Sequence, residues 1–314
     1  MVALAPLLLL DAPLTAQTVQ ISGQVIDADS APLRGIRVVL HRIGQERQGP
    51  IDSTRSDRRG RFDFRYRPDT AAFYLASARY SGIEYFSAPL PTNPARADTR
   101  LRVVVYDTSS TAPVELEARH LVLTRPGEDG SRSLLDLIIL RNSGRLTRVA
   151  PDTGKGSWTL PLPIGTVGLQ VRESDISSEA LTRSGNFLSI GAALAPGEKQ
   201  LTLEYQVPAG RESVELPVAR AGLPLNVLAE ESAVRVVAPG ISVADSQMIQ
   251  NRAFRRWSGS VGAATSVRIL LPGSRSAPRW VLPALVGGLA LALAGGSWYA
   301  LRRKRSLAAG GVSP

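Results

Sequence analysis

The chain has 314 residues, 44% of them hydrophobic and 20% charged, a composition typical of globular proteins with two or three domains. It contains no cysteine, which excludes disulfide scaffolds, cysteine-ligated metal sites and thiol nucleophiles. The formal net charge is +10, but 5 of the 37 basic residues are Arg279 and the four residues 302–305, and the rest carries no nucleic-acid-binding signature.

The amino terminus, residues 1–16, has the pattern of a secretory signal segment. An apolar stretch from Val2 to Leu10 precedes Leu14-Thr15-Ala16, a small-residue sequence typical of a cleavage site. No Lys or Arg precedes the stretch and Asp11 follows it, so an uncleaved segment is the alternative interpretation. The apolar part is too short to span a bilayer.

Residues 17–108 show the alternation that is typical of β-strands. Apolar residues occupy every second position in residues 19–25, 36–40, 62–66 and 101–105, and Gly, Pro, Asp and Ser separate these runs. A period of two places each apolar set on one face of a sheet. Strands separated by turn signals predict an antiparallel sandwich rather than a parallel α/β sheet.

Three motifs in this region occur in a characteristic order. They are ISGQVID at residues 21–27, APLRGIRV at residues 31–38 and SDRRGRFDF at residues 56–64. Together they resemble the carboxypeptidase regulatory-like domain, whose pattern is a G-x-V-x-D strand, a P-L-x-G turn and a D-x-x-G-x-F hairpin. The resemblance implies a small seven-stranded, transthyretin-like sandwich. It implies no activity, because this module accompanies many different proteins.

Residues 112–275 continue the β pattern without a fixed-period repeat. We expect strands at residues 116–123, 134–140, 158–162, 200–207, 213–218, 233–238 and 266–271. Pro-Gly pairs mark turns at several of their ends. This region therefore predicts one or two further sandwich domains, with a possible break near residues 208–211. Between residues 17 and 272 no stretch of ten or more residues has the 3.6-residue period of a helix.

The carboxyl-terminal segment, residues 279–301, predicts a single transmembrane helix. Trp280 to Leu301 contains no charged residue, and a helix of this length extends about 33 Å, enough for the hydrocarbon core of a bilayer. The basic cluster Arg302–Arg305 follows it and predicts a cytoplasmic tail at residues 302–314. Everything before the span then lies outside the cytoplasmic membrane, and a buried core helix is the alternative.

Small residues recur every fourth position of this segment. Ala284, Gly288, Ala292 and Gly296 share one helix face, and such a stripe lets two membrane helices approach closely. It predicts a homodimer through the span. The alternative is that Gly and Ala are simply common in membrane helices.

The candidate catalytic and metal-binding residues favour structural roles. His41 is expected on the solvent face of its strand, and His120 is expected to be a half-buried hydrogen-bonding residue. Asp27 begins a segment like the start of a calcium loop, but Ala31 occupies the third ligand position, so a plain turn is favoured. We therefore predict no catalytic residue, no metal site and no cofactor.

One segment stands out as a candidate binding surface. Arg252, Phe254, Arg255, Arg256 and Trp257 combine aromatic rings with arginines, which suit stacking on sugars, anionic polymers or lipid headgroups. The alternative is a loop or strand whose aromatic residues are buried.

These observations predict a non-enzymatic, single-pass protein of the inner membrane, with an extracytoplasmic β-sandwich ectodomain that binds or scaffolds an envelope protein or polymer. The alternative function is carbohydrate binding, with Trp158 or Trp257 as a stacking platform. A hydrolase that uses His120 is the weakest hypothesis, because no nucleophile motif accompanies it.

Overall fold

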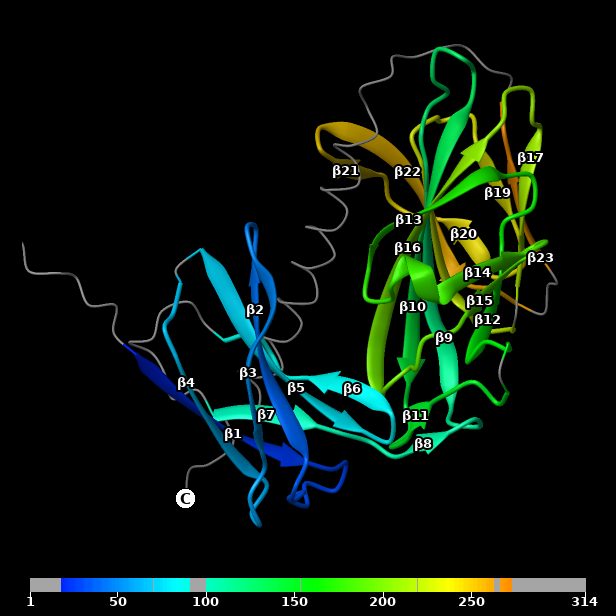
Figure 1. Cartoon of the computed structure of the whole chain (residues 1–314). Helices are drawn as coiled ribbons and strands as arrows, with labels where there is room; N and C mark the ends of the chain where they lie inside the picture. Colours follow the sequence, from blue (N-terminus) through cyan, green and yellow to red (C-terminus); the bar gives the residue numbers. More distant parts are fainter. Residues whose placement is uncertain are drawn as a thin grey trace, which may run out of the picture. The chain divides into compact units, whose positions relative to one another are not determined.

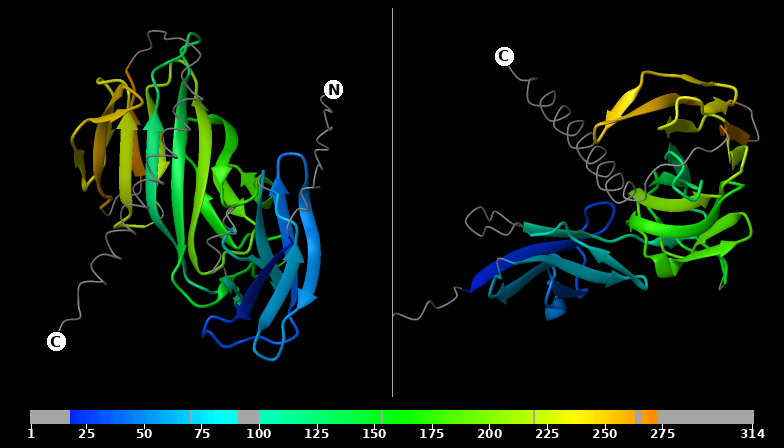
Figure 2. Two further views of the ribbon diagram at one scale, coloured as in Figure 1. Left: turned by 90° about the vertical axis from the view of Figure 1, so that its left-hand side faces the viewer. Right: turned by 90° about the horizontal axis from the view of Figure 1, so that it is seen from above.

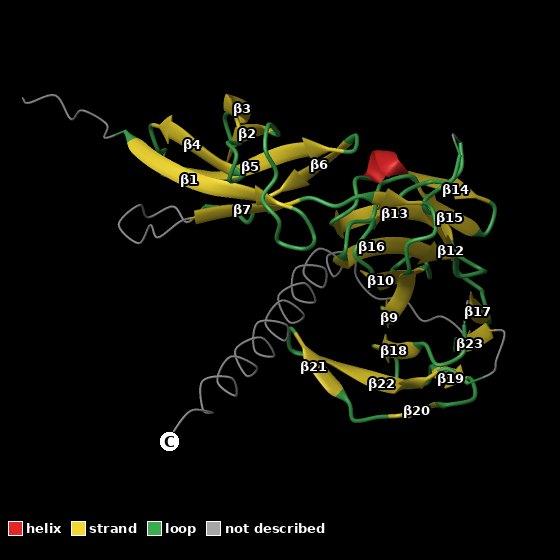
Figure 3. Ribbon diagram, turned by 90° about the horizontal axis from the view of Figure 1, so that it is seen from below, coloured by secondary structure: helices red, strands yellow, loops and turns green. Residues whose placement is uncertain are grey.

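The computed structural model describes residues 18–69, 71–90, 100–152, 154–218, 220–262 and 266–272. The chain divides into two compact units, Met1–Thr108 and Ser109–Pro314. The regular structure described is β, apart from one 3-10 turn at Ser178–Ala180 (Figure 3), so the prediction of a mainly β protein is confirmed.

The predicted signal segment, membrane span and basic tail lie outside the described residues, as does the small-residue face Ala284, Gly288, Ala292 and Gly296. Within the described ranges, no helix has the length and apolar character needed to cross a membrane.

Within its described residues, the first unit contains seven strands in two sheets (Figure 1). The strands are β1 (Val19–Ile26), β2 (Arg37–Gly44), β3 (Gln48–Arg55), β4 (Arg61–Tyr66), β5 (Ala72–Tyr80), β6 (Ile83–Phe86) and β7 (Arg100–Val104). One sheet has the order β4-β1-β7 and the other the order β3-β2-β5-β6. The rings of Tyr66 on β4 and Tyr74 on β5 lie 4.4 Å apart, so the two sheets contact each other through their side chains.

The glycines of two of the three sequence motifs in this unit allow a close approach between neighbouring strands. A Cβ atom at Gly23 would lie 2.2 Å from Cζ of Phe62, so the ring requires a glycine on the neighbouring strand. Gly60 has a φ of +71°, and a Cβ there would lie 2.5 Å from the carbonyl oxygen of Val25. Oδ1 of Asp57 accepts the backbone N–H groups of residues 59 and 61. The D-x-x-G-x-F motif therefore closes a hairpin and packs it on β1.

The second unit contains most of the remaining strands, and β8 (Thr108–Ser109) lies at the division between the units. Its strands are β9 (Val114–Leu123), β10 (Arg132–Asn142), β11 (Thr147–Arg148), β12 (Trp158–Pro161), β13 (Val167–Ser174), β14 (Leu181–Ser184), β15 (Phe187–Ile190), β16 (Gly197–Val207), β17 (Ser213–Pro217), β18 (Pro224–Ala229), β19 (Arg235–Val237), β20 (Ile241–Val243), β21 (Gln247–Ile249), β22 (Arg252–Ser260) and β23 (Ser266–Leu270).

A large sheet forms the body of this unit, with the order β13-β16-β10-β9-β18-β22-β20 and with β21 paired to β22. Two three-stranded sheets, β12-β15-β14 and β17-β23-β19, lie on one side of it (Figures 2 and 3). We call the side that they cover the covered face. The hydrophobic core beneath the small sheets contains Leu121 and Ile138 of the large sheet, which pack in one cluster with Leu188 and Val267 of the small sheets.

A buried ion pair lies within this core. Arg119 on β9 is 1% exposed and donates from Nε to Oδ1 of Asp136 on β10 at 2.8 Å and from Nη2 to Oδ2 at 2.5 Å. Nη1 of Arg119 donates to the carbonyl oxygen of Pro161 on β12 at 3.2 Å. Two strands of the large sheet and one strand of a small sheet therefore meet at one guanidinium group.

The strand directions and the possible domain break differ from the sequence-based expectations. The strand pairs β1–β7 and β9–β18 run parallel, because intervening strands carry the chain back to the same end before each pair forms. The possible domain break near residues 208–211 is a turn between β16 and β17. Both strands contribute to one core, through Val207 and Val214.

Candidate partner-binding surface

The side of the large sheet opposite the covered face carries a hydrophobic cluster of its own, and we call this side the second face. The cluster consists of Val122, Leu135, Leu228, Ile249 and Phe254. All five residues come from strands of the large sheet. Among the described residues, no other sheet contributes to this cluster. The second face therefore differs from the covered face, where two small sheets supply the opposing layer, although its five clustered side chains are also buried, at 0–6% exposed.

The strand register aligns five side chains of the second face in one row across the sheet. Leu135 on β10 lies opposite Glu204 on β16 and opposite Val122 on β9. Leu228 on β18 pairs with Val122 and, on its other side, with Arg256 on β22. The row is therefore a carboxylate, three apolar side chains and a guanidinium group. We call it the charged-end row.

Both ends of the charged-end row hold a buried polar atom without a hydrogen-bond partner. These atoms are Oε1 of Glu204 and Nε of Arg256, and no other buried side-chain nitrogen or oxygen in the described ranges lacks a partner. The second carboxylate oxygen of Glu204 accepts a bond from Nε of Arg172 at 2.5 Å. An unsatisfied buried polar group typically costs about 1–3 kcal/mol, so both atoms are expected to lower the stability of this face.

The next row of the second face is polar at its centre. His120 on β9 lies opposite Asn226 on β18, and Nδ2 of Asn226 donates to Nδ1 of His120 at 3.2 Å. His120 is half-buried, and this burial lowers the pKa of its imidazole, an effect that the negative charge of Asp136 opposes. The expectation of a half-buried, hydrogen-bonded histidine is confirmed.

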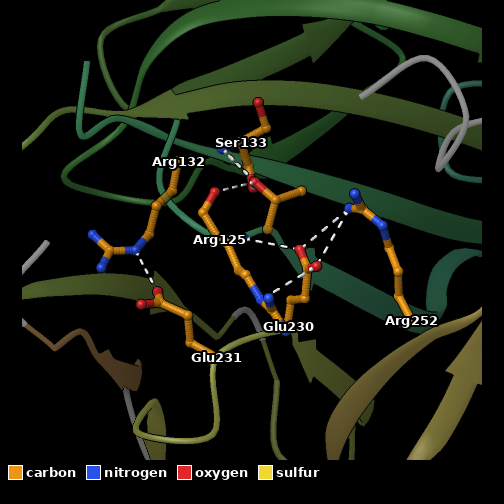
Figure 4. Close-up of polar contacts among 7 residues, drawn as sticks. Arg125, Arg132, Ser133, Glu230, Glu231 and Arg252 are labelled. Atoms are coloured by element: carbon orange, nitrogen blue, oxygen red, sulfur yellow. Dashed lines mark hydrogen bonds and ion pairs between the residues drawn. The ribbon is translucent and has the colours of Figure 1, made fainter. Parts of the chain in front are cut away.

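A groove of about 570 Å³ lies beside the second face and includes Phe254 of its cluster. Glu230, which is almost fully buried, lines the groove and forms ion pairs with Arg125 at 3.4 Å and with Arg252 at 3.3 Å (Figure 4). The carboxylate of Glu230 therefore forms ion pairs with both arginines. The groove is built from residues that sequence patterns did not single out, apart from Phe254 and Arg255.

Arg132, at the start of β10, joins three segments next to this groove. Its side chain is 1% exposed, and Nε donates to Oε2 of Glu231 at 2.7 Å (Figure 4). Nη2 of Arg132 donates to the carbonyl oxygen of Pro272 at 2.9 Å. Pro272 follows β23 and is the last described residue, so this arginine holds the point from which the predicted membrane linker departs.

The sequence-predicted patch at residues 252–257 does not form one exposed surface. These residues belong to β22, and Phe254 is 0% and Trp257 3% exposed, so neither ring is available for stacking on a sugar. Phe254 belongs to the cluster of the second face and Trp257 to the core of the covered face. The alternation of a strand buried on both sides separates them.

The arginines of the patch have separate roles. Arg252 pairs with Glu230, and the guanidinium of Arg255 lies 5.3 Å from the centre of the Trp257 ring. Only Arg256 contributes to the charged-end row. Trp158, the other expected stacking residue, is half-buried and packs against the main core.

The first unit holds a serine, a histidine and a glutamate in contact. Nε2 of His41 lies 2.8 Å from Oγ of Ser77, and this hydroxyl donates to Oε1 of Glu84 at 2.5 Å. The carboxylate therefore binds the serine, whereas a hydrolase triad places it on the second nitrogen of the imidazole. His41 is half-buried within this contact, although the sequence predicted a solvent-facing side chain.

The possible calcium loop at Asp27 is a turn. Oδ1 of Asp27 accepts the backbone N–H groups of Asp29 at 2.8 Å and of Ala31 at 2.9 Å. Within the part of the chain that the structure describes, no three His, Asp or Glu side chains are grouped closely enough to bind a metal ion.

Comparisons with known proteins give no family. No family model and no curated protein matches the chain. An M1 zinc metallopeptidase from Deinococcus radiodurans aligns with 50% of this chain and 42% of its own, at 12% identity and a TM-score of 0.30. Leukotriene A4 hydrolase from Saccharomyces cerevisiae aligns with 58% and 33% of the two chains, at 13% identity and a TM-score of 0.30. Similarity at this level carries no argument about activity.

Proposed function

We propose that this protein is a non-enzymatic, membrane-anchored component of the bacterial envelope, which displays two β units outside the inner membrane to bind a partner. One observation carries the proposal: 22 consecutive uncharged residues, Trp280 to Leu301, are followed directly by four basic residues. A span with this orientation places residues 17–272 on the extracytoplasmic side.

The contacts of the ectodomain support a binding role. Several of its charged residues have structural roles: Arg119 and Asp136 join two sheets, Arg132 binds the end of the last strand, and Asp57 closes a hairpin. A groove of about 570 Å³ beside the second face is lined by Arg125, Glu230 and Phe254, among other residues. Confinement beside a membrane raises the effective concentration of such a surface toward a neighbouring protein.

The resemblance of residues 17–108 to the carboxypeptidase regulatory-like domain supports the same proposal. Modules of that family are accessories of larger proteins and carry no activity of their own. The first unit would then present or space the second unit.

Cysteine labelling in intact cells tests the topology, because the natural chain has no cysteine. Asn186, an exposed turn residue between β14 and β15, and Ser313 in the tail are each replaced by Cys. A membrane-impermeant maleimide should label Asn186→Cys in spheroplasts, whereas Ser313→Cys should react only after lysis. Labelling of Ser313→Cys but not Asn186→Cys in spheroplasts contradicts the proposal, as does recovery of the full-length chain in the soluble cytosolic fraction.

A further inference from the structure

The groove beside the second face is open to solvent. Its volume of about 570 Å³ lies within the range of sites that hold small organic ligands. Six of its lining residues are exposed: Arg125, Ser232, Ala233, Val243, Ser246 and Ala253. A ligand therefore reaches the groove without any rearrangement of the buried cluster on the second face.

The charges around the groove do not balance. Six charged side chains line it or form ion pairs with its lining residues: Arg125, Arg132, Arg252, Arg255, Glu230 and Glu231. Four of them are cations and two are anions, so the set carries a net charge of +2. The exposed Asp245 lies between two lining residues in the chain, and the sum stays positive when its carboxylate is counted.

Two of these arginines retain hydrogen-bond donors for a ligand. The side chain of Arg125 is 56% exposed and forms an ion pair with Glu230 at 3.4 Å, but its guanidinium group forms no hydrogen bond within the described residues. Nη1 of Arg255 donates to the carbonyl oxygen of Ser232 at 3.1 Å, and no carboxylate in the described part of the chain pairs with this arginine. The hydroxyl groups of Ser232 and Ser246, which also line the groove, are further donors.

The chain that continues from the groove does not supply the missing negative charge. Pro272 lines the groove, and residues 273–314 contain no Asp or Glu. The nearest charged residues in this segment are Arg275 and Arg279. An anion that balances the groove is therefore a separate molecule.

A phosphate ester fits these donors better than a carboxylate does. A phosphate monoester carries about two negative charges near neutral pH and presents three acceptor oxygens, which arginine binds through paired N–H groups. A carboxylate carries one charge on two oxygens. The positive surplus, the two arginines and the two hydroxyl groups together match the phosphate.

We infer that the groove binds an organic phosphate, whose phosphoryl oxygens accept hydrogen bonds from Arg125 and Arg255 and whose organic part lies against Val243 and Ala253. Val243 and Ala253 provide the exposed apolar surface of the groove. The inference goes beyond the proposed function, because it requires neither the membrane span nor its orientation.

Butyl phosphate tests the inference on the full chain in dodecyl maltoside, an uncharged detergent that contains no phosphate. Calorimetric titration at low ionic strength should give a dissociation constant of about 1 mM or lower. Pentanoate, a carboxylate of similar length, should bind at least about tenfold more weakly, because it offers one charge and two oxygens. Butanol, which has no charge, should give no measurable heat of binding.

Substitutions in the groove locate the binding site. Arg125→Gln removes a guanidinium group while Arg252 still pairs with Glu230, so the variant should fold and lose about tenfold or more in affinity for butyl phosphate. Ala253→Phe leaves the charges unchanged but fills the groove, and it should weaken binding by a similar factor. Arg268→Gln is the matched control, because Arg268 is exposed on β23 and does not line the groove. Circular dichroism verifies that each variant is folded.

The phosphoryl group can come from a soluble ester or from the headgroup of an anionic phospholipid. Dihexanoylphosphatidylglycerol, a short-chain lipid, is therefore titrated beside butyl phosphate. Tighter binding of the lipid identifies a headgroup as the ligand, whereas tighter binding of butyl phosphate identifies a soluble ester, and both results support the inference. Dihexanoylphosphatidylcholine should bind more weakly than the glycerol lipid, because its cationic headgroup opposes the arginines.

Three results would overturn the inference. The first is a dissociation constant above about 1 mM for both butyl phosphate and the glycerol lipid. The second is binding of pentanoate as tight as that of butyl phosphate. The third is an equal loss of affinity in Arg125→Gln and Arg268→Gln, which would show attraction to the net charge of the chain rather than binding in the groove. None of these results affects labelling at Asn186, so failure of the phosphate site is distinguishable from failure of the membrane topology.

Discussion

The ion pair between Arg119 and Asp136 is the residue-scale contact with the greatest expected effect on stability. Both side chains are almost completely buried, so removal of one partner leaves an uncompensated charge. Arg119→Met should lower the free energy of unfolding by about 3–5 kcal/mol. The double variant Arg119→Met/Asp136→Leu should recover much of this loss, because it removes both charges. Urea unfolding followed by circular dichroism measures the differences.

A surface ion pair on the same strand provides the control for this prediction. Arg141 on β10 pairs with Glu117 and Glu198, and all three side chains are exposed. Arg141→Met should change the free energy of unfolding by less than about 1 kcal/mol, because solvent screens exposed pairs. An Arg119→Met variant as stable as Arg141→Met contradicts the role assigned to the buried pair.

His120 predicts a dependence of stability on pH. Burial holds the pKa of its imidazole below the ordinary value of 6.5, so the unfolded chain takes up a proton more readily than the folded chain. The contribution of neutral His120 to the free energy of unfolding is therefore complete above pH 6.5. It decreases as the pH falls from 6.5 toward the pKa of His120 in the folded chain. His120→Gln should flatten the fall in unfolding free energy between pH 7.5 and 5.5, measured in urea. His41→Gln serves as the comparison, and an identical flattening in both variants would argue against the assignment.

At the scale of the elements, alternation predicts strands well where a strand has one buried face. In β16, Leu201, Leu203 and Tyr205 are buried and alternate with other residues, as the sequence pattern predicted. β22 lacks this signal because both of its faces are buried, with Phe254 on one side and Trp257 on the other. Composition alone therefore left two interpretations open, one exposed surface or a strand with buried aromatic residues, and the second is confirmed for Phe254 and Trp257.

The charged-end row could not be predicted from the sequence. Glu204, Leu135, Val122, Leu228 and Arg256 lie on five strands, and only the cross-strand register aligns them. Alternation indicates which side of its own strand a residue occupies, but it gives neither strand order nor register. Glu204 alternates with Leu203 and Tyr205, so the sequence indicates that it lies on the opposite side of the strand. It does not indicate which residues of the adjacent strands lie beside Glu204.

Arg132 should determine how strongly the backbone amides of β23, the last strand, are protected from hydrogen exchange. Its guanidinium group joins Glu231 to the carbonyl oxygen of Pro272, two residues beyond β23. Arg132→Met removes both charge-assisted hydrogen bonds, so amide hydrogen exchange at Val267 and Ile269 should accelerate by about tenfold or more. Mass spectrometry of peptides from β23 measures the change. Arg268→Met, on the exposed side of the same strand, should leave the exchange rates nearly unchanged, and equal acceleration in both variants contradicts this role.

At the scale of the whole molecule, the position of Pro272 limits the distance between the second unit and the bilayer. Seven residues lie between it and Trp280, where the predicted span begins, and the eight residue-to-residue steps of a fully extended chain reach about 28 Å. Because Arg132 fixes Pro272, the groove beside Glu230 is tethered near the membrane if the span is inserted as proposed. A partner that binds this unit would then be recruited most readily from a neighbouring membrane-anchored protein.

The predicted span itself would determine whether the ectodomain is presented as one copy or as two. Ala284, Gly288, Ala292 and Gly296 repeat every fourth residue, a spacing that allows close helix contact in a bilayer. Gly288→Ile should prevent this approach and reduce self-association in membranes, whereas Gly287→Ile, on a different side of the helix, should leave it largely intact. Resonance energy transfer between donor- and acceptor-labelled copies of the full chain in vesicles measures the difference. Equal transfer in the two variants would contradict dimerisation through this face, and a single-copy ectodomain would then recruit its partner without a second copy.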